Sequence, residues 1–397
     1  MTANTSEPAG SSEVSSLNQT TVLAATILAV LLAGYLLTIY GWRQMALFLV
    51  GTTAGVALYH AAFGFTGAWR QMISNRRSAG LRSQMVMLSV ALLVFMPLLD
   101  AGSLFGTPLR GAVAPLSSSV VVGAFLFGIG MQLGGGCASG TLFTVGGGSV
   151  RMIVTLLAFV AGSVIGASHW EIWRAAPALP PVSLLQTTGL TGAVLISLSA
   201  FALVWYLAGT LERRRHGDIA SPNSPDGSRW LRGPWPLLAG ALALAAVNVA
   251  TLTLAGRPWG VTSAFALWGS KAAAGIGMDV AAWPYWQRAG PASALESSVF
   301  SDITSIMNFG IVLGAMAAAG LAGRFAPSLK IPARSLLAAI IGGLLLGYGA
   351  RIAYGCNIGA FFSGLSSASL HGWLWFAAAF AGNAVAVRLR PLFGLSR

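Results

Sequence analysis

Stretches of about twenty mostly apolar residues recur ten times along this 397-residue chain, each long enough to cross the roughly 30 Å hydrocarbon layer of a bilayer as an α-helix. Charged residues make up 8% of the chain, against about 25% in soluble domains. A content of 8% is too low to cover the surface of a soluble protein. The pattern predicts an all-α polytopic membrane protein and excludes a soluble enzyme and a disordered chain. The predicted helices lie near 20–41, 44–62, 83–101, 118–136, 152–168, 189–209, 234–255, 299–320, 335–354 and 373–390.

The chain is strongly basic, with 23 Lys and Arg residues, 10 Asp and Glu residues and a net charge of +13. The basic residues lie in short loops between the apolar runs rather than on one soluble surface, so we expect a lipid bilayer and no nucleic acid as partner. If the chain crosses the membrane ten times, 16 basic residues fall on the side that holds both chain ends and 6 fall on the other side. Cytoplasmic loops carry such an excess, which places both termini in the cytoplasm.

Two polar segments suggest the domain organisation. Residues 1–19 are rich in Ser and Thr and are expected to form a disordered tail. Residues 211–233 carry a run of arginines followed by Pro, Ser, Gly and Asp, which is typical of a basic cytoplasmic linker. The linker separates a first membrane repeat at 20–210 from a second at 234–397.

The two halves share two sequence motifs in the same order. GIGMQLGGGCASG from Gly128 and GYGARIAYGCNIG from Gly347 fit one frame, GxGxxxxxGCxxG, which places both cysteines of the protein at the same position. FGFTGA from Phe63 and WGVTSA from Trp259 form the second pair. The members of each pair are five crossings apart, and an odd number predicts two repeats inverted in the membrane, as in many transporters. The stretches 63–69 and 258–275 are candidates for re-entrant segments.

The cysteine motifs are the strongest candidates for a binding site. Cys137 follows Gly136 and Cys356 follows Gly355, each at the end of an apolar helix. Glycines let a solute approach the free N–H groups of a broken helix, and a thiol is a polarizable weak donor that suits a sulfur-bearing solute. The alternative is that each cysteine is a small buried apolar side chain. We expect no metal, cofactor or catalytic residue, because the four histidines are scattered and no CxxC occurs.

Polar residues near the motifs complete the candidate pathway. Hydroxyl groups there could bind an anion or bond back to helix carbonyls. Arg351 lies inside a predicted helix, where it could attract an anion, pair with Asp302 or act as a helix-end cation. The further candidates are Gly64, Thr66, Gly260, Thr262, Ser263 and Asn357.

These motifs resemble the YeeE/YedE family of bacterial sulfur-compound transporters. The matching segments are YHAAFGFTGAWR from Tyr59, GMQLGGGCASG from Gly130, RPWGVTSAFALWG from Arg257 and GYGARIAYGCNIG from Gly347. The resemblance implies uptake of thiosulfate across the bacterial inner membrane through an hourglass-shaped protein. It also implies contact between the sulfur end of the ion and the thiols of Cys137 and Cys356, and a TusA-like sulfurtransferase as a cytoplasmic partner.

The chain departs from this family at one point. The family route includes a third cysteine in the first half, which is absent here, and Thr66 is the polar side chain near the expected position. Two alternatives therefore remain: a transporter of another sulfur or selenium compound, and a membrane-embedded thiol sulfurtransferase. The second needs an activated thiolate and a base, and no histidine adjoins either cysteine motif.

Overall fold

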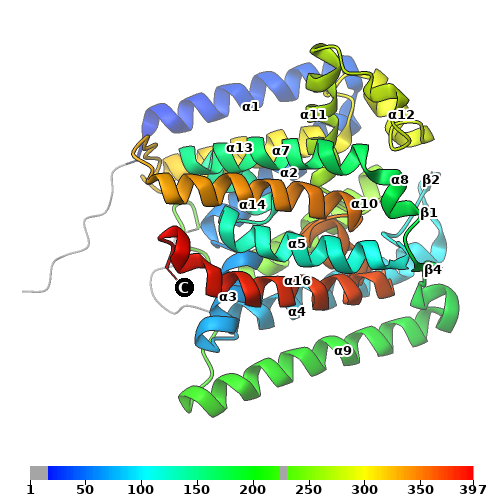
Figure 1. Ribbon diagram of the computed structural model, residues 1–397, viewed down its shortest axis with the longest axis vertical. Helices are drawn as coiled ribbons and strands as arrows, with labels where there is room; N and C mark the ends of the chain where they lie inside the picture. Colours follow the sequence, from blue (N-terminus) through cyan, green and yellow to red (C-terminus); the bar gives the residue numbers. More distant parts are fainter. Residues whose placement is uncertain (1–16, 223–229, 397) are drawn as a thin grey trace, which may run out of the picture.

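The computed structural model describes residues 17–222 and 230–396 of the chain. Within them, ten helical segments are long and apolar enough to cross a membrane, which confirms the predicted all-α polytopic fold. These segments run side by side (Figure 1). Their main helices are α1 Gln19–Tyr40, α2 Trp42–His60, α4 Ala79–Ala101, α5 Ser118–Gly134, α7 Val150–Ser168, α9 Leu184–His216, α10 Leu237–Ala255, α13 Ile303–Leu321, α14 Ala333–Ile352 and α16 Leu370–Leu389.

Shorter elements fill the breaks between the long helices. Two small antiparallel pairs, β1 with β2 and β3 with β4, lie at the end of the bundle opposite the C-terminus (Figure 1). The short helices are α3 Phe65–Asn75, α6 Ala138–Gly146, α8 Trp170–Arg174, α11 Thr262–Gly275, η1 Val280–Ala282, α12 Ala289–Glu296, η2 Asn357–Phe362, α15 Ser363–Ser366 and η3 Arg390–Phe393. The strands are β1 Ser103–Leu104, β2 Thr107–Pro108, β3 Leu116–Ser117 and β4 Ala178–Leu179.

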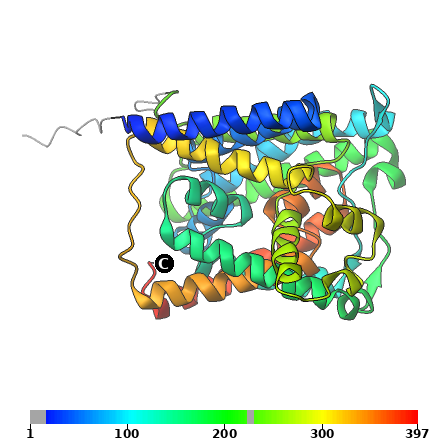
Figure 2. The ribbon, with the colours of Figure 1, turned by 90° about the horizontal axis from the view of Figure 1, so that it is seen from above.

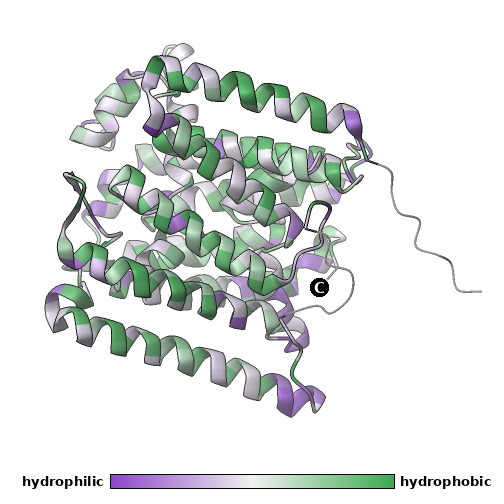
Figure 3. Cartoon of the chain, turned by 180° about the vertical axis from the view of Figure 1, so that it is seen from behind, coloured by the Kyte–Doolittle hydropathy of each residue, from purple (hydrophilic) through white to green (hydrophobic). Residues whose placement is uncertain are grey.

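The helix ends differ most from the sequence prediction around the central linker. Helix α9 continues to His216, so the first residues of the expected linker are helical. The helix is interrupted at Gly189, whose φ of 71° is not helical. This interruption coincides with the predicted start of the crossing at residue 189. The remaining linker includes residues 223–229, which lie outside the described residues, as does most of the predicted tail at 1–19. Hydrophobic residues run along the helices, and hydrophilic ones gather at ends such as that of α9 (Figure 3).

Helices from the two halves of the chain pack in reciprocal pairs. Helix α7 packs on α14 as α16 packs on α5, and α2 packs on α13 as α10 packs on α4. Helices α1 and α9 cover opposite edges of the bundle, on α13 and α4 respectively (Figure 1). Two related halves would produce this exchange of partners.

The first glycines of the cysteine motifs serve this packing. A Cβ atom on Gly128 would lie 2.1 Å from the carbonyl oxygen of Ala379, and one on Gly347 would lie 2.1 Å from that of Phe159. Both glycines therefore let a helix of one half touch the backbone of the other half, as small residues commonly do in membranes. Thus the start of the shared frame fixes helix crossings, and only its end forms the candidate site.

Candidate functional site

Each cysteine motif interrupts a helix in the same way. Helix α5 ends at Gly135, whose φ is 95°, and the extended Cys137 then begins α6. Helix α14 is followed by Tyr354, with a φ of 60°, and the extended Cys356 begins η2. The predicted breaks are therefore present, and each leads into a short helix that the sequence analysis did not anticipate.

The glycine before each cysteine is required by close backbone contacts. A Cβ atom on Gly136 would lie 3.0 Å from the backbone of Gly140. One on Gly355 would lie 2.8 Å from the nitrogen of Ala360, and the φ of Gly355, 152°, is one that other residues rarely adopt. A side chain at either position would push the short helix away from the cysteine that begins it.

The two cysteines are buried in the same part of the protein. Both are free thiols, at most 1% exposed, and belong to one core cluster. The short helices that they begin, α6 and η2, touch each other, so the motifs meet where the halves join. The Cys137 sulfur accepts a hydrogen bond from the Gly140 N–H at 3.4 Å and lies 3.5 Å from the Ser139 hydroxyl. The Cys356 thiol makes no capping hydrogen bond like that of Cys137, and the backbone N–H groups of Ile358 and Gly359 lie near its sulfur.

Unpartnered polar groups are buried next to Cys356 and in the first-half break. Asn357 is fully buried, and neither its side-chain nitrogen nor its oxygen has a partner among the described residues. The hydroxyl of Thr66 is also buried without a partner. An unpaired buried polar group costs about 1–3 kcal/mol, so these groups are typical of a site that a ligand completes.

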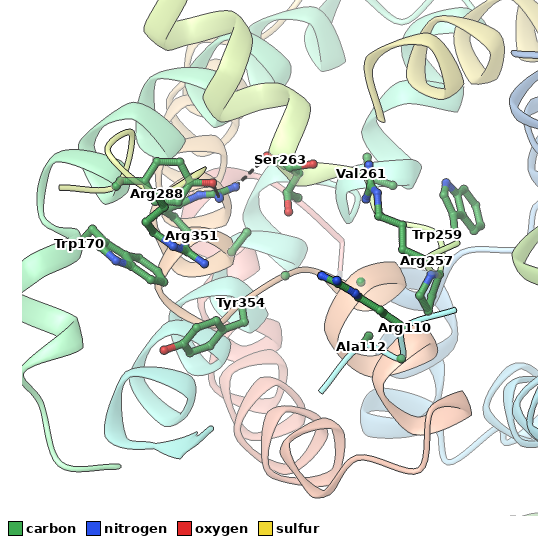
Figure 4. A pocket seen from close by; sticks show the side chains of 18 residues that line it. Arg110, Ala112, Trp170, Arg257, Trp259, Val261, Ser263, Arg288, Arg351 and Tyr354 are labelled. Atoms are coloured by element: carbon green, nitrogen blue, oxygen red, sulfur yellow. Dashed lines mark hydrogen bonds between the residues drawn. The ribbon is translucent and has the colours of Figure 1, made fainter. Parts of the chain in front are cut away.

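A cavity of about 450 Å³ leads from one end of the bundle to the floor formed by Gly355. It contains five of the predicted site residues: Gly260, Thr262, Ser263, Arg351 and Gly355. Four arginines line its wall, and no Asp or Glu does so within the described part of the chain (Figure 4). We call it the outer cavity, because it lies at the end opposite the C-terminus. Its lining residues are Arg110, Gly111, Ala112, Trp170, Arg257, Pro258, Trp259, Gly260, Val261, Thr262, Ser263, Tyr285, Arg288, Ala350, Arg351, Tyr354, Gly355 and Gly359.

Arg351 is held in this wall by two hydrogen bonds. It donates to the carbonyl oxygen of Thr262 at 3.0 Å and to the hydroxyl of Tyr285. In the other half, the equivalent residue Gln132 donates to the carbonyl oxygen of Thr66 at 3.1 Å. The two halves thus use the same contact to hold the start of α3 and of α11, but only one of them places a positive charge there.

Asp302 is engaged elsewhere, so the alternative of an Arg351–Asp302 pair is wrong. Its carboxylate caps α13 by accepting from the backbone N–H and the hydroxyl of Ser305, each at 2.7 Å. It also lies near Arg257. Withdrawal from solvent lowers the pKa of the Arg257 guanidinium and the Asp302 charge opposes that shift, so Arg257 remains a cation.

The hydroxyl of Ser263 does not bond back to its own helix, as one alternative held. It donates to the hydroxyl of Thr304 at 3.0 Å, and that hydroxyl also accepts from Arg257 at 3.1 Å. Ser263 therefore helps to orient a cation of the cavity wall.

A second, smaller pocket of about 240 Å³ lies toward the opposite end of the bundle, beside α3 and the start of α4 (Figure 1). Gly64 lines it, together with Gln71, Gln84 and Arg77. Arg77 is paired there with Glu212 at 3.2 Å and with Asp218 at 3.1 Å. This inner pocket is therefore close to neutral, unlike the outer cavity.

Three of the four cavity arginines, Arg110, Arg257 and Arg288, were not predicted as site residues, nor was Tyr285. The only signal was that the three arginines lie in loops assigned to the same membrane side. Within the described residues no three His, Cys, Asp or Glu side chains lie together as a metal site requires.

Broken helices that meet at the centre of a bundle of membrane-spanning segments, with a cavity leading to them, define a membrane transport protein rather than an enzyme. The sequence pattern of the Sulphur transport family matches residues 60–385, and the chain belongs to this family. Its relatives fall into two groups. This chain is 27% identical over 339 residues to the thiosulfate transporter TsuA of Spirochaeta thermophila. The matched region covers 82% of this chain and 92% of that protein.

The other relatives are similar at comparable levels. The thiosulfate transporter TsuA of Escherichia coli is 25% identical over 82% of this chain and 87% of its own length. The probable transporter YedE of Escherichia coli is 31% identical over 166 residues, and the match spans 41% of this chain and about two fifths of that protein. These matches support the resemblance found in the motifs.

Proposed function

We propose that this protein carries thiosulfate, or a similar sulfur-containing anion, across the bacterial inner membrane into the cell. The family and the two relatives named as thiosulfate transporters support this substrate class. The proposed route enters the outer cavity, passes the buried layer of Cys137 and Cys356, and leaves by the inner pocket. Two wider ends joined by this narrow layer would give the hourglass implied by the family resemblance.

One observation carries the proposal: a free thiol and an unpartnered amide are buried side by side at Cys356 and Asn357. Thiosulfate has a terminal sulfur at one end and three oxygens at the other. A thiol is a polarizable donor to the sulfur, while amide and hydroxyl groups donate to oxygen. With Thr66 in place of the third family cysteine, the site offers two thiols and two oxygen-binding groups, and none of them binds covalently, so the ion is released.

The ends of the chain fit inward transport. The C-terminus and the described start of the chain lie at the same end of the bundle as the inner pocket (Figure 1). This arrangement agrees with the predicted cytoplasmic termini, and it leaves the inner pocket accessible to a TusA-like sulfurtransferase. The neutral inner pocket would release an anion more readily than the cationic outer cavity.

The test is uptake of ³⁵S-labelled thiosulfate into cells that lack other thiosulfate and sulfate importers. We expect Cys137→Ala and Cys356→Ala to reduce uptake at least tenfold at equal membrane abundance. Ser163→Ala is the matched control, because Ser163 is a buried residue of α7 that donates to the Gly347 carbonyl away from the thiols. Normal uptake by both cysteine variants would overturn the proposed route.

The wild type decides the substrate. Absence of uptake by a well-expressed wild-type chain would overturn thiosulfate as the cargo, and labelled selenite or sulfite would then be tried. Transfer of sulfur onto Cys137 or Cys356, seen as a mass increase of the protein after incubation with the donor, would instead favour sulfurtransferase chemistry.

A further inference from the structure

The last turn of helix α5, which leads into the first cysteine motif, is covered by two arginine side chains from distant parts of the chain. Arg151, at the start of α7, donates to the carbonyl oxygens of Leu133 and Gly134, each at 2.7 Å. Arg390, which follows α16, donates to the carbonyl oxygen of Gln132 at 2.5 Å. We call Arg151 and Arg390 the arginine clamp.

The clamp completes the hydrogen bonding of this helix end. The last four carbonyl groups of an α-helix have no partner within the helix itself. The carbonyl of Met131 accepts from the backbone N–H of Gly135 at 3.0 Å, and the clamp binds the carbonyls of the other three residues. A Cβ atom on Gly135 would lie 2.8 Å from the guanidinium of Arg151, so this glycine leaves room for the clamp.

The clamp brings more charge than a helix end requires. A helix C-terminus carries roughly half a negative charge, whereas each arginine carries a full positive one. Among the described residues, ion pairs form at Arg77 and Arg174, and neither clamp arginine joins one. Arg70 of α3, one helical turn after Thr66, is close enough to repel Arg390 and adds a third cation. The first-half break is therefore flanked by net positive charge.

A purely structural cap would not need this charge. Arg390 is 6% exposed, and withdrawing a guanidinium from water costs free energy that a neutral donor avoids. The break in the second half uses neutral donors: the N–H groups of Ala353 and Gly355 bind the carbonyls of Gly349 and Ala350, each at 2.9 Å. In the part of the chain that the structure describes, no arginine donates to the last turn of α14.

The clamp also ties both halves together at the inner end of the bundle. The Nε of Arg151 donates to the hydroxyl of Ser335 on α14 at 2.8 Å, and that of Arg390 donates to the carbonyl of Ser396 at 2.5 Å. Helix η3, which begins at Arg390, touches α14. Figure 2 shows the C-terminus at the same end of the bundle as the start of α14. Contacts from α7, α14 and η3 thus fix where the two charges lie.

We infer that Arg151 and Arg390 are positioning residues that act by their charge, because they convert the negative end of α5 into a positive surface that an anion can pass on its way from Cys137 to the cytoplasm. Without the clamp, an anion beside Cys137 would face the free carbonyl groups of the helix end three residues away in the chain. The clamp donors are bound to carbonyls, so they hold the helix and do not capture the ion. This inference rests on the proposed function and deepens it.

The first test separates charge from hydrogen bonding in uptake of ³⁵S-labelled thiosulfate. Arg151→Lys keeps the charge but cannot make all the bonds of the fork, whereas Arg151→Gln keeps a donor and loses the charge. We expect the Gln variant to lower the maximal rate per folded molecule about tenfold and the Lys variant no more than about threefold. The same order should hold for Arg390→Lys and Arg390→Gln.

Thermal unfolding of the purified variants shows how much of any loss is structural. Both substitutions at each position remove carbonyl bonds, so both should lower the unfolding temperature. Arg388→Gln is the matched control, because Arg388 is an exposed arginine of α16 that also donates to a backbone carbonyl, that of Ala384 at 3.3 Å. If the Lys and Gln variants transport at equal rates per folded molecule, the clamp is only structural and the inference is overturned.

The second test measures the charge without relying on the cargo. A cysteine is placed at Gly67 in the full chain carrying Cys137→Ala and Cys356→Ala. Gly67 lines the inner pocket, and a Cβ atom there would meet nothing within 4 Å. It follows Thr66, whose carbonyl accepts from Gln132, so it lies close to the clamped helix end. The probes are an anionic and a cationic methanethiosulfonate, and the readout is the ratio of their rates of reaction with this thiol.

The ratio of anionic to cationic reaction rates should fall about fivefold in the Arg151→Gln and Arg390→Gln chains and should stay unchanged in the Lys chains and in Arg388→Gln. A ratio that ignores both Gln substitutions would overturn the inference. If the ratio falls as expected but the wild type imports no thiosulfate, the positive surface stands and the proposed cargo fails. If uptake depends on the thiols but neither the ratio nor the maximal rate depends on the clamp charge, the cargo stands and the clamp fails.

Discussion

Replacing Asn357 by leucine should stabilise this protein and strongly reduce transport. Asn357 is fully buried, and its amide has no partner for either polar atom. Each such atom costs about 1–3 kcal/mol, and leucine of similar size removes both costs. The tight fit around η2 would offset part of this gain, so we expect a net stabilisation of about 1–3 kcal/mol. The equivalent residue of the first half is Ala138, which shows that an apolar residue is compatible with the start of such a short helix.

The same change should remove a donor to the anion. A hydrogen bond to a charged group contributes about 1.5–3 kcal/mol, and about 1.4 kcal/mol corresponds to a factor of ten. Asn357→Leu should therefore lower thiosulfate uptake at low substrate concentration by about 10- to 150-fold. Stability would be followed by thermal unfolding of the purified protein in detergent, and uptake would be measured in cells at matched abundance.

Asn248→Leu is the matched control for this experiment. Asn248 is also fully buried, but its amide donates to the hydroxyl of Ser363 at 3.2 Å and its oxygen accepts from the backbone of Trp259 at 2.9 Å. The same substitution there should destabilise the protein by about 1–3 kcal/mol, because it leaves the Trp259 N–H unpaired, while the Ser363 hydroxyl keeps its bond to the Trp259 carbonyl. The reasoning is refuted if Asn357→Leu destabilises the protein as Asn248→Leu does. It is also refuted if Asn357→Leu raises the unfolding temperature and the variant still transports normally.

Three further predictions follow from single contacts. Gly355→Ala should reduce membrane abundance and thermal stability by about 2–4 kcal/mol, because its Cβ would meet the backbone of Ala360 at 2.8 Å; unchanged thermal unfolding would contradict this. Arg351→Gln should fold, since Gln132 makes the equivalent bond, but should raise the half-saturating thiosulfate concentration about tenfold in uptake assays; a wild-type value would refute a role for the charge. Glu212→Gln should lower stability by about 1–3 kcal/mol in thermal unfolding while uptake per folded molecule is unchanged, because one of its two buried oxygens, which accept from Ser78 and from Arg77 with Ala220, becomes a donor.

Much of the fold was predictable because it depends on quantities measured along the chain. The length of each apolar run fixes where a helix can cross the bilayer, and all ten predicted crossings correspond to membrane-spanning segments of the structure. The repeated frame around Cys137 and Cys356 also marked the two helix breaks correctly. Short helices such as α6 escaped prediction because nine residues carry no clear apolar period of their own.

Part of the site was less predictable, since the same residue type has different roles in different surroundings. The glycines of the shared frame looked alike in sequence, yet Gly128 lets two helices touch and Gly136 permits the close approach of the Gly140 backbone. Asn357 and Asn248 are both buried asparagines, and only their neighbours show that one is satisfied and the other is not. Such differences depend on hydrogen-bond geometry, which is set by other segments of the chain.

By itself, the sequence determined the membrane-spanning class, the number of crossings, the equivalence of the two cysteines and the family, because apolar length and motif spacing are properties of one dimension. Tertiary structure alone decided that the short helices after the two cysteines touch, that Arg351 bonds to Thr262 rather than to Asp302, and that Arg110 and Arg288 share one cavity. The physical reason is that burial, charge and hydrogen bonding act through space, here between residues that the chain separates by as many as 219 positions.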